Sequence, residues 1–167
     1  LQAGKLEMLV TQTVDGLHEK AGVEPHKLVE LHGSNARVQC QRCGAEADVA
    51  AAFAAFEKTR KAPCCATCDG PLKPATISFG QSLVADDIDR AEQAARGCDL
   101  VIALGSSLTV TPAATFPLLA AQRGAPYAIV NRGVTEHDGL REVTLRIEGD
   151  VIEIFPPAVA AALTGGG

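Results

Sequence analysis

Four of the six cysteines form two C-x-x-C pairs, Cys40 with Cys43 and Cys65 with Cys68. Roughly 20 residues separate the pairs, which is a spacing typical of structural zinc sites. Turn-forming residues beside each pair favour tight turns that aim two sulfurs at one ion. Four thiolates at about 2.3 Å complete a tetrahedron, so no position stays open for chemistry. The pattern therefore predicts a structural Zn²⁺ ion.

There are two alternatives to a zinc site with these four ligands. A redox or disulfide pair would need the same thiols, but nothing in the sequence suggests secretion. Cys64 precedes Cys65 directly and could also chelate with Cys68. We favour Cys65 as the ligand because it makes the two turns identical.

Polar side chains follow an apolar run near the start of the chain. Gln12, Thr13 and Asp15 come after residues 6–10, which we expect to form a buried strand. Ligands of open α/β sheets bind at the carboxyl ends of the strands, so these side chains are placed for a polar ligand. A capped turn into the next helix would have the same composition.

His32 ends a second apolar run and precedes Gly33. An imidazole titrates near neutral pH and can act as a general base. The following glycine lets a ligand approach the backbone closely. A lone histidine is more often structural, so the position favours a catalytic role without establishing it.

Two similar strand ends occur in the second half. Gly105, Ser106 and Ser107 follow the apolar run 98–104, and Asn131 and Arg132 follow the run 127–130. Glycine and hydroxyls between a strand and a helix are typical of a phosphate or ribose cradle. The segment is neither a Walker loop nor G-x-G-x-x-G, so alone it is a weak signal.

Apolar periodicity predicts strands over 6–10, 28–31, 75–80, 98–104, 127–130 and 143–147, and helices over 19–23, 49–61, 86–96, 113–122 and 151–163. Strand 98–104 is continuously apolar, as expected when both faces of a sheet are covered. Phe53 and Phe56 are expected to be packing groups. The alternation predicts an α/β fold: an incomplete Rossmann-like parallel sheet over 1–35 and 77–167, with a zinc-ribbon module inserted at 36–76. Residues 164–167 are expected to be a frayed tail.

The composition excludes some classes of function. The net charge of −5 over 167 residues argues against a primary nucleic-acid role. Basic residues do gather near the cysteines, where we expect a solvated face. No apolar run reaches membrane-spanning length and no signal peptide opens the chain, so we expect a cytoplasmic protein without a membrane partner.

Together these motifs resemble those of the sirtuins, the NAD-dependent protein deacylases. Residues 11–18, T-Q-T-V-D-G-L-H, resemble T-Q-N-[IV]-D-x-L-H, and Leu31-His32-Gly33 resembles the catalytic H-G. Residues 79–81 are similar to F-G-E, residues 105–108 to G-T-S-L, and Asn131 to a ribose-binding Asn. The motifs occur in family order over nearly the whole chain, with the four cysteines matching the zinc ribbon.

The resemblance implies removal of acetyl or acyl groups from protein lysine with NAD, which gives nicotinamide and O-acyl-ADP-ribose. It implies His32 as the general base. The implied NAD contacts are Gln12, Thr13 and Asp15 for the nicotinamide half, and Gly105, Ser106, Ser107, Asn131, Arg132 and Val151 for the adenosine half. Ile77, Phe79 and Gly80 would line the acyl-lysine channel and pair with the substrate backbone.

Three departures from the family pattern bear on activity. Thr13 stands where the family has Asn, and a hydroxyl cannot replace both functions of an amide. Gln81 replaces Glu. The family's G-A-G-x-S and G-I-P-D-F-R segments are not in this chain, so we expect poor NAD binding and exposed apolar strand edges. The missing segments and Thr13 favour a non-catalytic binding module as the alternative function. An NAD-dependent ADP-ribosyltransferase is a further alternative, because it would use the same site.

Overall fold

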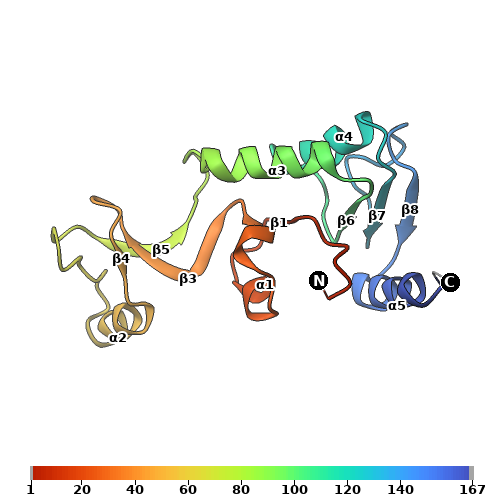
Figure 1. Cartoon of the computed structure of the whole chain (residues 1–167). Coiled ribbons are helices and arrows are strands. Elements are labelled where there is room, and N and C mark those ends of the chain that lie inside the picture. Colours follow the sequence, from red (N-terminus) through yellow and green to blue (C-terminus); the bar gives the residue numbers. More distant parts are fainter. Residues whose placement is uncertain (1, 166–167) are drawn as a thin grey trace. The chain divides into compact units, whose positions relative to one another are not determined.

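The computed structural model describes residues 2–165, and by contacts the chain divides into two compact units. One unit is Leu9–Asp87, and the other combines Leu1–Met8 with Ile88–Gly167 (Figure 1). The predicted boundaries at 35/36 and 76/77 fall inside the first of these units. The division into a Rossmann-like domain and a zinc module stays a prediction, and the last two residues of the predicted tail lie outside the described residues.

The Leu9–Asp87 unit begins with a short parallel pair of strands. Strand β1, Leu9–Thr11, pairs with β2, Leu28–Glu30, from Leu9 opposite Leu28 to Thr11 opposite Glu30. Helix α1, Leu17–Lys20, and the 3-10 helix η1, Pro25–Lys27, connect them. Because the strands are parallel and in step, the segments after Thr11 and Glu30 leave the same edge.

The same unit contains an antiparallel sheet in the order β4-β3-β5, built from Glu46–Ala47, Gly33–Cys40 and Leu72–Thr76. Helix α2, Val49–Thr59, is rich in alanine and is capped by Asp48, whose carboxylate accepts from the Ala51 N–H at 2.7 Å. The core of this part joins Val38, Cys40, Ala52, Cys65 and Leu72. Cysteines are thus part of the hydrophobic core, so the zinc site and the core depend on each other.

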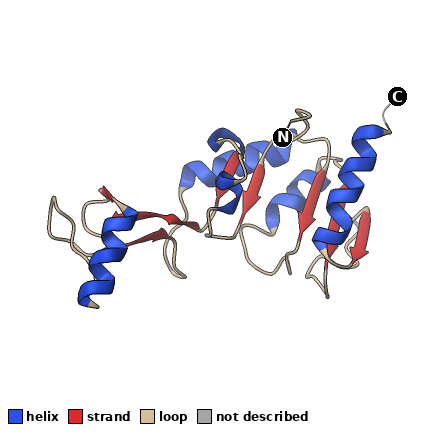
Figure 2. Ribbon diagram, turned by 90° about the horizontal axis from the view of Figure 1, so that it is seen from below, coloured by secondary structure: helices blue, strands red, loops and turns tan. Residues whose placement is uncertain are grey.

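The other unit contains a parallel sheet in the order β6-β7-β8, formed by Val101–Leu104, Tyr127–Asn131 and Leu145–Glu148 (Figure 2). Helix α3 is Ala85–Gly97, α4 is Thr115–Gln122 and α5 is Val151–Thr164. Helix α4 packs on β6 and β7, and α5 packs on β7. Tyr127 and Ile129 are fully buried at the centre of the core. The predicted α/β architecture with parallel strands is confirmed.

Several predicted elements are shorter than expected. The strand predicted at 6–10 is Leu9–Thr11, because its ladder partner has three residues. The strand predicted at 75–80 ends at Thr76, opposite Gly33 where β3 begins, so Ile77, Phe79 and Gly80 follow the strand. The strand predicted at 98–104 starts at Val101, because the Cys98 N–H still bonds to Ala94 O at the end of α3.

Burial corrects two expectations. Ile102 and Leu104 are exposed on alternate positions of β6, so the described part of the chain covers one face of this strand and not both. Phe53 and Phe56 are also about half exposed, although we expected them to be packing groups. No helix among residues 2–165 is both long and apolar enough to span a membrane.

Candidate functional site

The four predicted zinc ligands lie together. The sulfurs of Cys40, Cys43, Cys65 and Cys68 are all within 4.8 Å of one another. The Cys40–Cys68 sulfurs are 3.5 Å apart and the Cys43–Cys65 sulfurs 3.8 Å. A tetrahedron with bonds of about 2.3 Å has edges of about 3.8 Å, so the spacing fits Zn²⁺. Cys64 is exposed and does not belong to this group.

Backbone groups shape the metal site. The Arg42 N–H points at Cys40 Sγ at 3.3 Å, and the Thr67 N–H points at Cys65 Sγ at 3.4 Å, so the two C-x-x-C turns have the same geometry. Gly70 lies against the sulfurs: a Cβ there would be 2.7 Å from Cys40 Sγ and 3.2 Å from Cys68 Sγ. The site therefore requires glycine at position 70, which spacing alone did not predict.

The thiols influence one another's ionisation. Backbone N–H groups, foremost that of Cys43, lower the pKa of Cys40 to about 6. The Gly70 N–H opposes the change at Cys68, but hydrogen bonds with the Cys43 and Cys40 thiols raise the pKa of Cys68 to about 12. Four clustered thiolates repel one another unless a cation lies between them. A divalent, thiophilic ion such as Zn²⁺ is the chemistry that satisfies this donor set.

His32 follows β2 and is half-buried. Its Nδ1 lies 3.2 Å from the backbone oxygen of Gln12, which follows the neighbouring strand β1. A carbonyl oxygen can only accept, so in the neutral imidazole Nδ1 carries the hydrogen and Nε2 has the lone pair. The parallel pairing of β1 and β2 thus brings two predicted site residues together and sets the tautomer of the imidazole.

Gly33 has a different role from the one expected. We predicted that it leaves space for a ligand, but a Cβ at Gly33 would be 2.0 Å from the backbone oxygen of Ala75. Its φ of 72° is also in the left-handed region. The space beside Gly33 is filled by β5, so the glycine permits close strand packing next to His32.

The other predicted residues after β1 lie in a tight turn. Thr13 Oγ1 is 2.9 Å from Thr11 Oγ1, and the Asp15 carboxylate accepts from the Leu17 N–H at 2.9 Å. Asp15 therefore closes the turn that leads into α1, although the N-cap of this helix is Gly16, and the Asp15 side chain is exposed. After β5, the Ile77 N–H bonds to His32 O at 2.8 Å, and Phe79 is fully exposed.

In the other unit, the strand ends surround a hollow of about 280 Å³. It is lined by Gly105, Asn131, Arg132, Gly149, Asp150, Val151 and Ile152. Four of the predicted residues, Gly105, Asn131, Arg132 and Val151, are among them. Ser106 and Ser107 do not line it: their hydroxyls bond to the Leu108 N–H at 3.2 Å and to Thr109 Oγ1 at 3.0 Å.

Asp150 is a lining residue that the sequence reasoning missed. Its carboxylate accepts from the Ile152 N–H at 2.7 Å, capping α5, and forms an ion pair with Arg132 at 2.7 Å. The signal was present in the sequence, because an Asp before a helical pattern is a typical N-cap. The ion pair therefore holds the Arg132 guanidinium next to the N-terminus of α5.

Arg146 on β8 stabilises the turn after β7 through hydrogen bonds. Its guanidinium donates to Asn131 O at 3.1 Å, to Gly133 O at 2.6 Å and to the Asp138 carboxylate at 2.8 Å. The Arg146 hydrogen bond, with help from Thr135, lowers the pKa of Asp138 to about 2. One side chain therefore positions the backbone of Asn131, which lines the hollow, and of Gly133 in the turn that follows.

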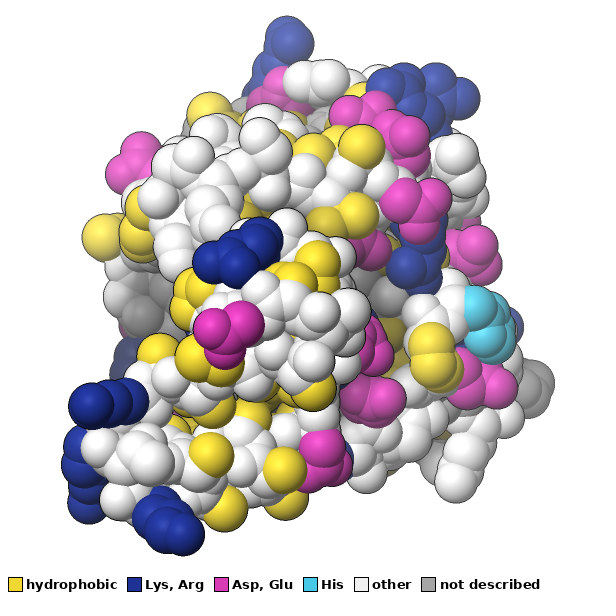
Figure 3. All heavy atoms as spheres, turned by 90° about the vertical axis from the view of Figure 1, so that its left-hand side faces the viewer, with side chains coloured by type: hydrophobic (Ala, Val, Ile, Leu, Met, Phe, Trp, Pro, Cys, Tyr) yellow, Lys and Arg dark blue, Asp and Glu magenta, His cyan; other side chains and the backbone are white. Residues whose placement is uncertain are grey.

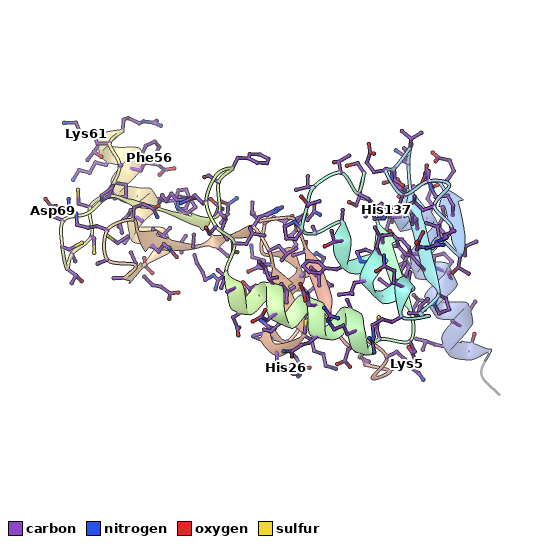
Figure 4. The ribbon with its side chains drawn as sticks, turned by 90° about the horizontal axis from the view of Figure 1, so that it is seen from above. Lys5, His26, Phe56, Lys61, Asp69 and His137 are labelled. Atoms are coloured by element: carbon purple, nitrogen blue, oxygen red, sulfur yellow. The ribbon has the colours of Figure 1, made fainter. Side chains whose placement is uncertain are left out.

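The buried side chain of His137 should make the stability of the fold depend on pH. Its side chain is buried, at 5% exposure, and its Nδ1 is 2.9 Å from the Tyr127 hydroxyl (Figure 4). Burial lowers the pKa of His137, although the Glu136 and Glu142 carboxylates partly oppose this. The folded state thus binds fewer protons at His137 than the unfolded chain does. The full free energy of unfolding is therefore present above pH 6.5, the unfolded pKa, and part of it is lost as the pH falls towards the folded pKa of His137.

We expect urea denaturation to show a falling free energy of unfolding between pH 7 and pH 5.5. A His137→Gln protein should show a shallower fall over the same interval, because glutamine does not titrate. Equal slopes for the two proteins would contradict this assignment.

Comparison with known proteins places the chain in a family. The Sir2 family profile matches residues 1–112. An NAD-dependent protein deacetylase of Rhodopseudomonas palustris is 43% identical over 158 residues, covering 95% of this chain and 62% of that protein. A Thermotoga maritima protein of the same name is 35% identical, covering 91% of this chain and 60% of the relative. The chain thus spans less than two thirds of the length of these relatives.

Solved structures agree. A Sir2–p53 peptide–NAD⁺ complex superposes with a TM-score of 0.86 at 34% identity, covering 99% of this chain and 65% of that one. A structure of Sir2Tm bound to a propionylated peptide gives the same TM-score and identity, with 66% of that chain covered. The resemblance drawn from the motifs and the sirtuin-like α/β fold are both confirmed. The chain belongs to the Sir2 family.

Proposed function

We propose that the protein, as part of a complete sirtuin, removes acetyl or acyl groups from protein lysine with NAD, producing nicotinamide and O-acyl-ADP-ribose. The observation that carries this is the hydrogen bond between His32 Nδ1 and Gln12 O, which leaves Nε2 able to accept a proton. Relatives over the same residues are NAD-dependent protein deacetylases, and related structures hold NAD or acylated peptides, which supports the proposal.

The hollow beside Asn131 fits part of a dinucleotide. Its volume of about 280 Å³ is close to the lower end of small-molecule pockets, roughly 300 Å³. The backbone of Gly105 enters it without a side chain, and the α5 N-terminus borders it. Gly105, Asn131, Arg132 and Val151 would hold the adenosine half of NAD there, and Ser106 and Ser107 would support the turn.

Bound NAD would supply an electrophilic ribose carbon for the acyl oxygen of the substrate lysine, with nicotinamide as the leaving group. His32 would accept at Nε2 a proton from a ribose hydroxyl, and the Gln12 carbonyl would stabilise the resulting imidazolium by accepting from Nδ1. Gln12, Thr13 and Asp15 would contact the nicotinamide half. Ile77, Phe79 and Gly80, which follow β5, would hold the acyl-lysine peptide of a protein substrate. We also propose a cytoplasmic location.

The test is conversion of an acetyl-lysine peptide into the same peptide with an unmodified lysine by the complete protein with NAD. We expect His32→Ala to lower kcat by about 10²- to 10⁴-fold, the usual contribution of a general base. His26→Ala is the matched control, because His26 is exposed and pairs with Glu24. If the His32→Ala protein keeps full activity, the assigned mechanism is wrong.

One observation favours the non-catalytic alternative. The Thr13 hydroxyl is engaged with Thr11 at 2.9 Å, so it has less to offer the nicotinamide amide than the usual Asn. Titration calorimetry of this chain with NAD separates the two functions, because tight binding would remove the main support for a binding module. Product analysis would distinguish deacylation from ADP-ribosyl transfer, which would use the same residues.

A further inference from the structure

A second hollow, of about 260 Å³, lies between α2, β3 and β5, and none of the residues assigned above lines it. Val38 and Leu72 form its floor, and Phe53, Phe56 and Pro63 lie around it. Every lining side chain except that of Lys73 is apolar. The zinc-bearing part of the chain therefore has an apolar recess that neither the metal site nor the proposed reaction uses.

The two phenylalanines at this recess are incompletely buried. Phe53 is 49% exposed and Phe56 is 43% exposed, in a chain that has five Phe, one Tyr and no Trp. They are three residues apart on α2 and so face the same side of the helix. When a partner side chain covers large aromatic side chains that are half exposed, the burial of their apolar surface stabilises the complex.

Cations border the recess. Lys58, Arg60 and Lys61 lie within the five residues after Phe56, are all exposed, and precede the lining residues Ala62 and Pro63. Figure 4 labels Phe56 and Lys61 at this end of the chain. Together with Lys73, the three basic residues make four cations, none of which belongs to an ion pair found among residues 2–165. Glu57 is the single carboxylate of stretch 49–63, although the whole chain has a net charge of −5.

The space-filling view of this end of the protein shows the same pattern. In Figure 3, dark-blue Lys and Arg side chains lie beside yellow hydrophobic side chains along its lower left edge. This local charge is opposite in sign to that of the whole chain. It attracts carboxylates, while the net negative charge disfavours a nucleic acid.

We propose that this recess, the Phe53/Phe56 recess, docks a short acidic segment of a partner protein that carries one leucine- or phenylalanine-sized anchor. The volume is too small for an extended ligand but suits a single buried anchor side chain. Flanking carboxylates of the segment would pair with Arg60, Lys61 and Lys73. The proposal is independent of the deacylase activity, because no residue of that site lines the recess.

The test is fluorescence anisotropy with the zinc-loaded chain. The probe is a fluorescein-labelled peptide with a central leucine or phenylalanine flanked by aspartates and glutamates. We expect saturable binding that weakens as salt rises. Probes with a central serine, or with lysines in place of the acids, should bind at least about tenfold more weakly.

Two variants address the two halves of the recess. Phe56→Ser should weaken binding of the acidic leucine peptide about tenfold, and the double change Arg60→Glu with Lys61→Glu should do the same without altering the hollow. Val134→Ser is the matched control, because Val134 is an exposed apolar residue outside the recess and has no part in the proposed NAD or acyl-lysine contacts. Zinc content and circular dichroism verify that each variant is folded.

Three results would overturn the proposal. The first is no saturable binding of the acidic peptides up to about 1 mM, the weak limit of specific association. The second is binding that the double charge reversal leaves unchanged. The third is tighter binding of a labelled single-stranded oligonucleotide than of the acidic peptides, which would assign the cations to nucleic acid.

Discussion

Replacing Cys65 with serine should remove zinc and unfold the part of the chain around the metal. The Cys65 sulfur is 3.8 Å from that of Cys43, and Cys65 is also a buried member of the core with Val38 and Leu72. Structural zinc contributes about 10–16 kcal/mol of folding free energy in zinc-finger peptides, so loss of a ligand removes a large part of the stability here. Elemental analysis should find equimolar zinc in the original protein and almost none in Cys65→Ser.

Cys64→Ser is the matched control, one residue away. Cys64 is exposed and outside the cluster, and the Asp69 carboxylate raises the pKa of its thiol, which disfavours the thiolate that a metal needs. This protein should keep its zinc and its circular dichroism spectrum. Retention of zinc by Cys65→Ser, with loss from Cys64→Ser, would reverse the ligand assignment.

Replacing Gly33 with alanine should be the most damaging single-methyl change near His32. The added Cβ would be 2.0 Å from Ala75 O, a backbone atom that cannot move without breaking the β3–β5 pairing. The φ of 72° adds about 1–2 kcal/mol of strain for a residue with a side chain. We expect the free energy of unfolding in urea to fall by more than about 4 kcal/mol, an exceptional value for one substitution.

Gly22→Ala separates the two causes. Gly22 also has a positive φ, 88°, but a Cβ there would have nothing within 4 Å. Only the strain remains, so the loss should be about 1–2 kcal/mol. If both alanine proteins lose the same stability, the clash with β5 is not the reason that position 33 is glycine.

Much of the chemistry could be predicted from the sequence because it is local. A C-x-x-C pair lies within one turn, so Cys40 with Cys43 and Cys65 with Cys68 were recognisable from spacing alone. His32 and Asn131 follow apolar runs directly, and the runs became β2 and β7. Helix α2 was predicted from its alanines, and the structure adds an Asp48 cap at its start.

Strand ends were predicted less well, because a strand ends where its partner does. The run 75–80 alternates as a strand should, yet β5 ends at Thr76, where the partner strand β3 begins. The run 98–104 is apolar throughout, yet its first residues close α3 and its strand has exposed positions. An apolar or alternating pattern indicates that a segment tends to form extended backbone. Where the strand ends depends on whether a partner strand is there to accept its hydrogen bonds.

The sequence by itself determined the family and predicted that the four cysteines lie together, since each motif depends on residues a few positions apart. The role of His32 stays a prediction. Only the tertiary structure decided that His32 Nδ1 meets the Gln12 carbonyl, that Arg146 holds the Asn131 turn, and that Asp150 borders the hollow. The same is true of the recess beside Phe53 and Phe56. These contacts join segments distant in the chain, and their geometry follows from strand register and side-chain packing, which no local pattern encodes.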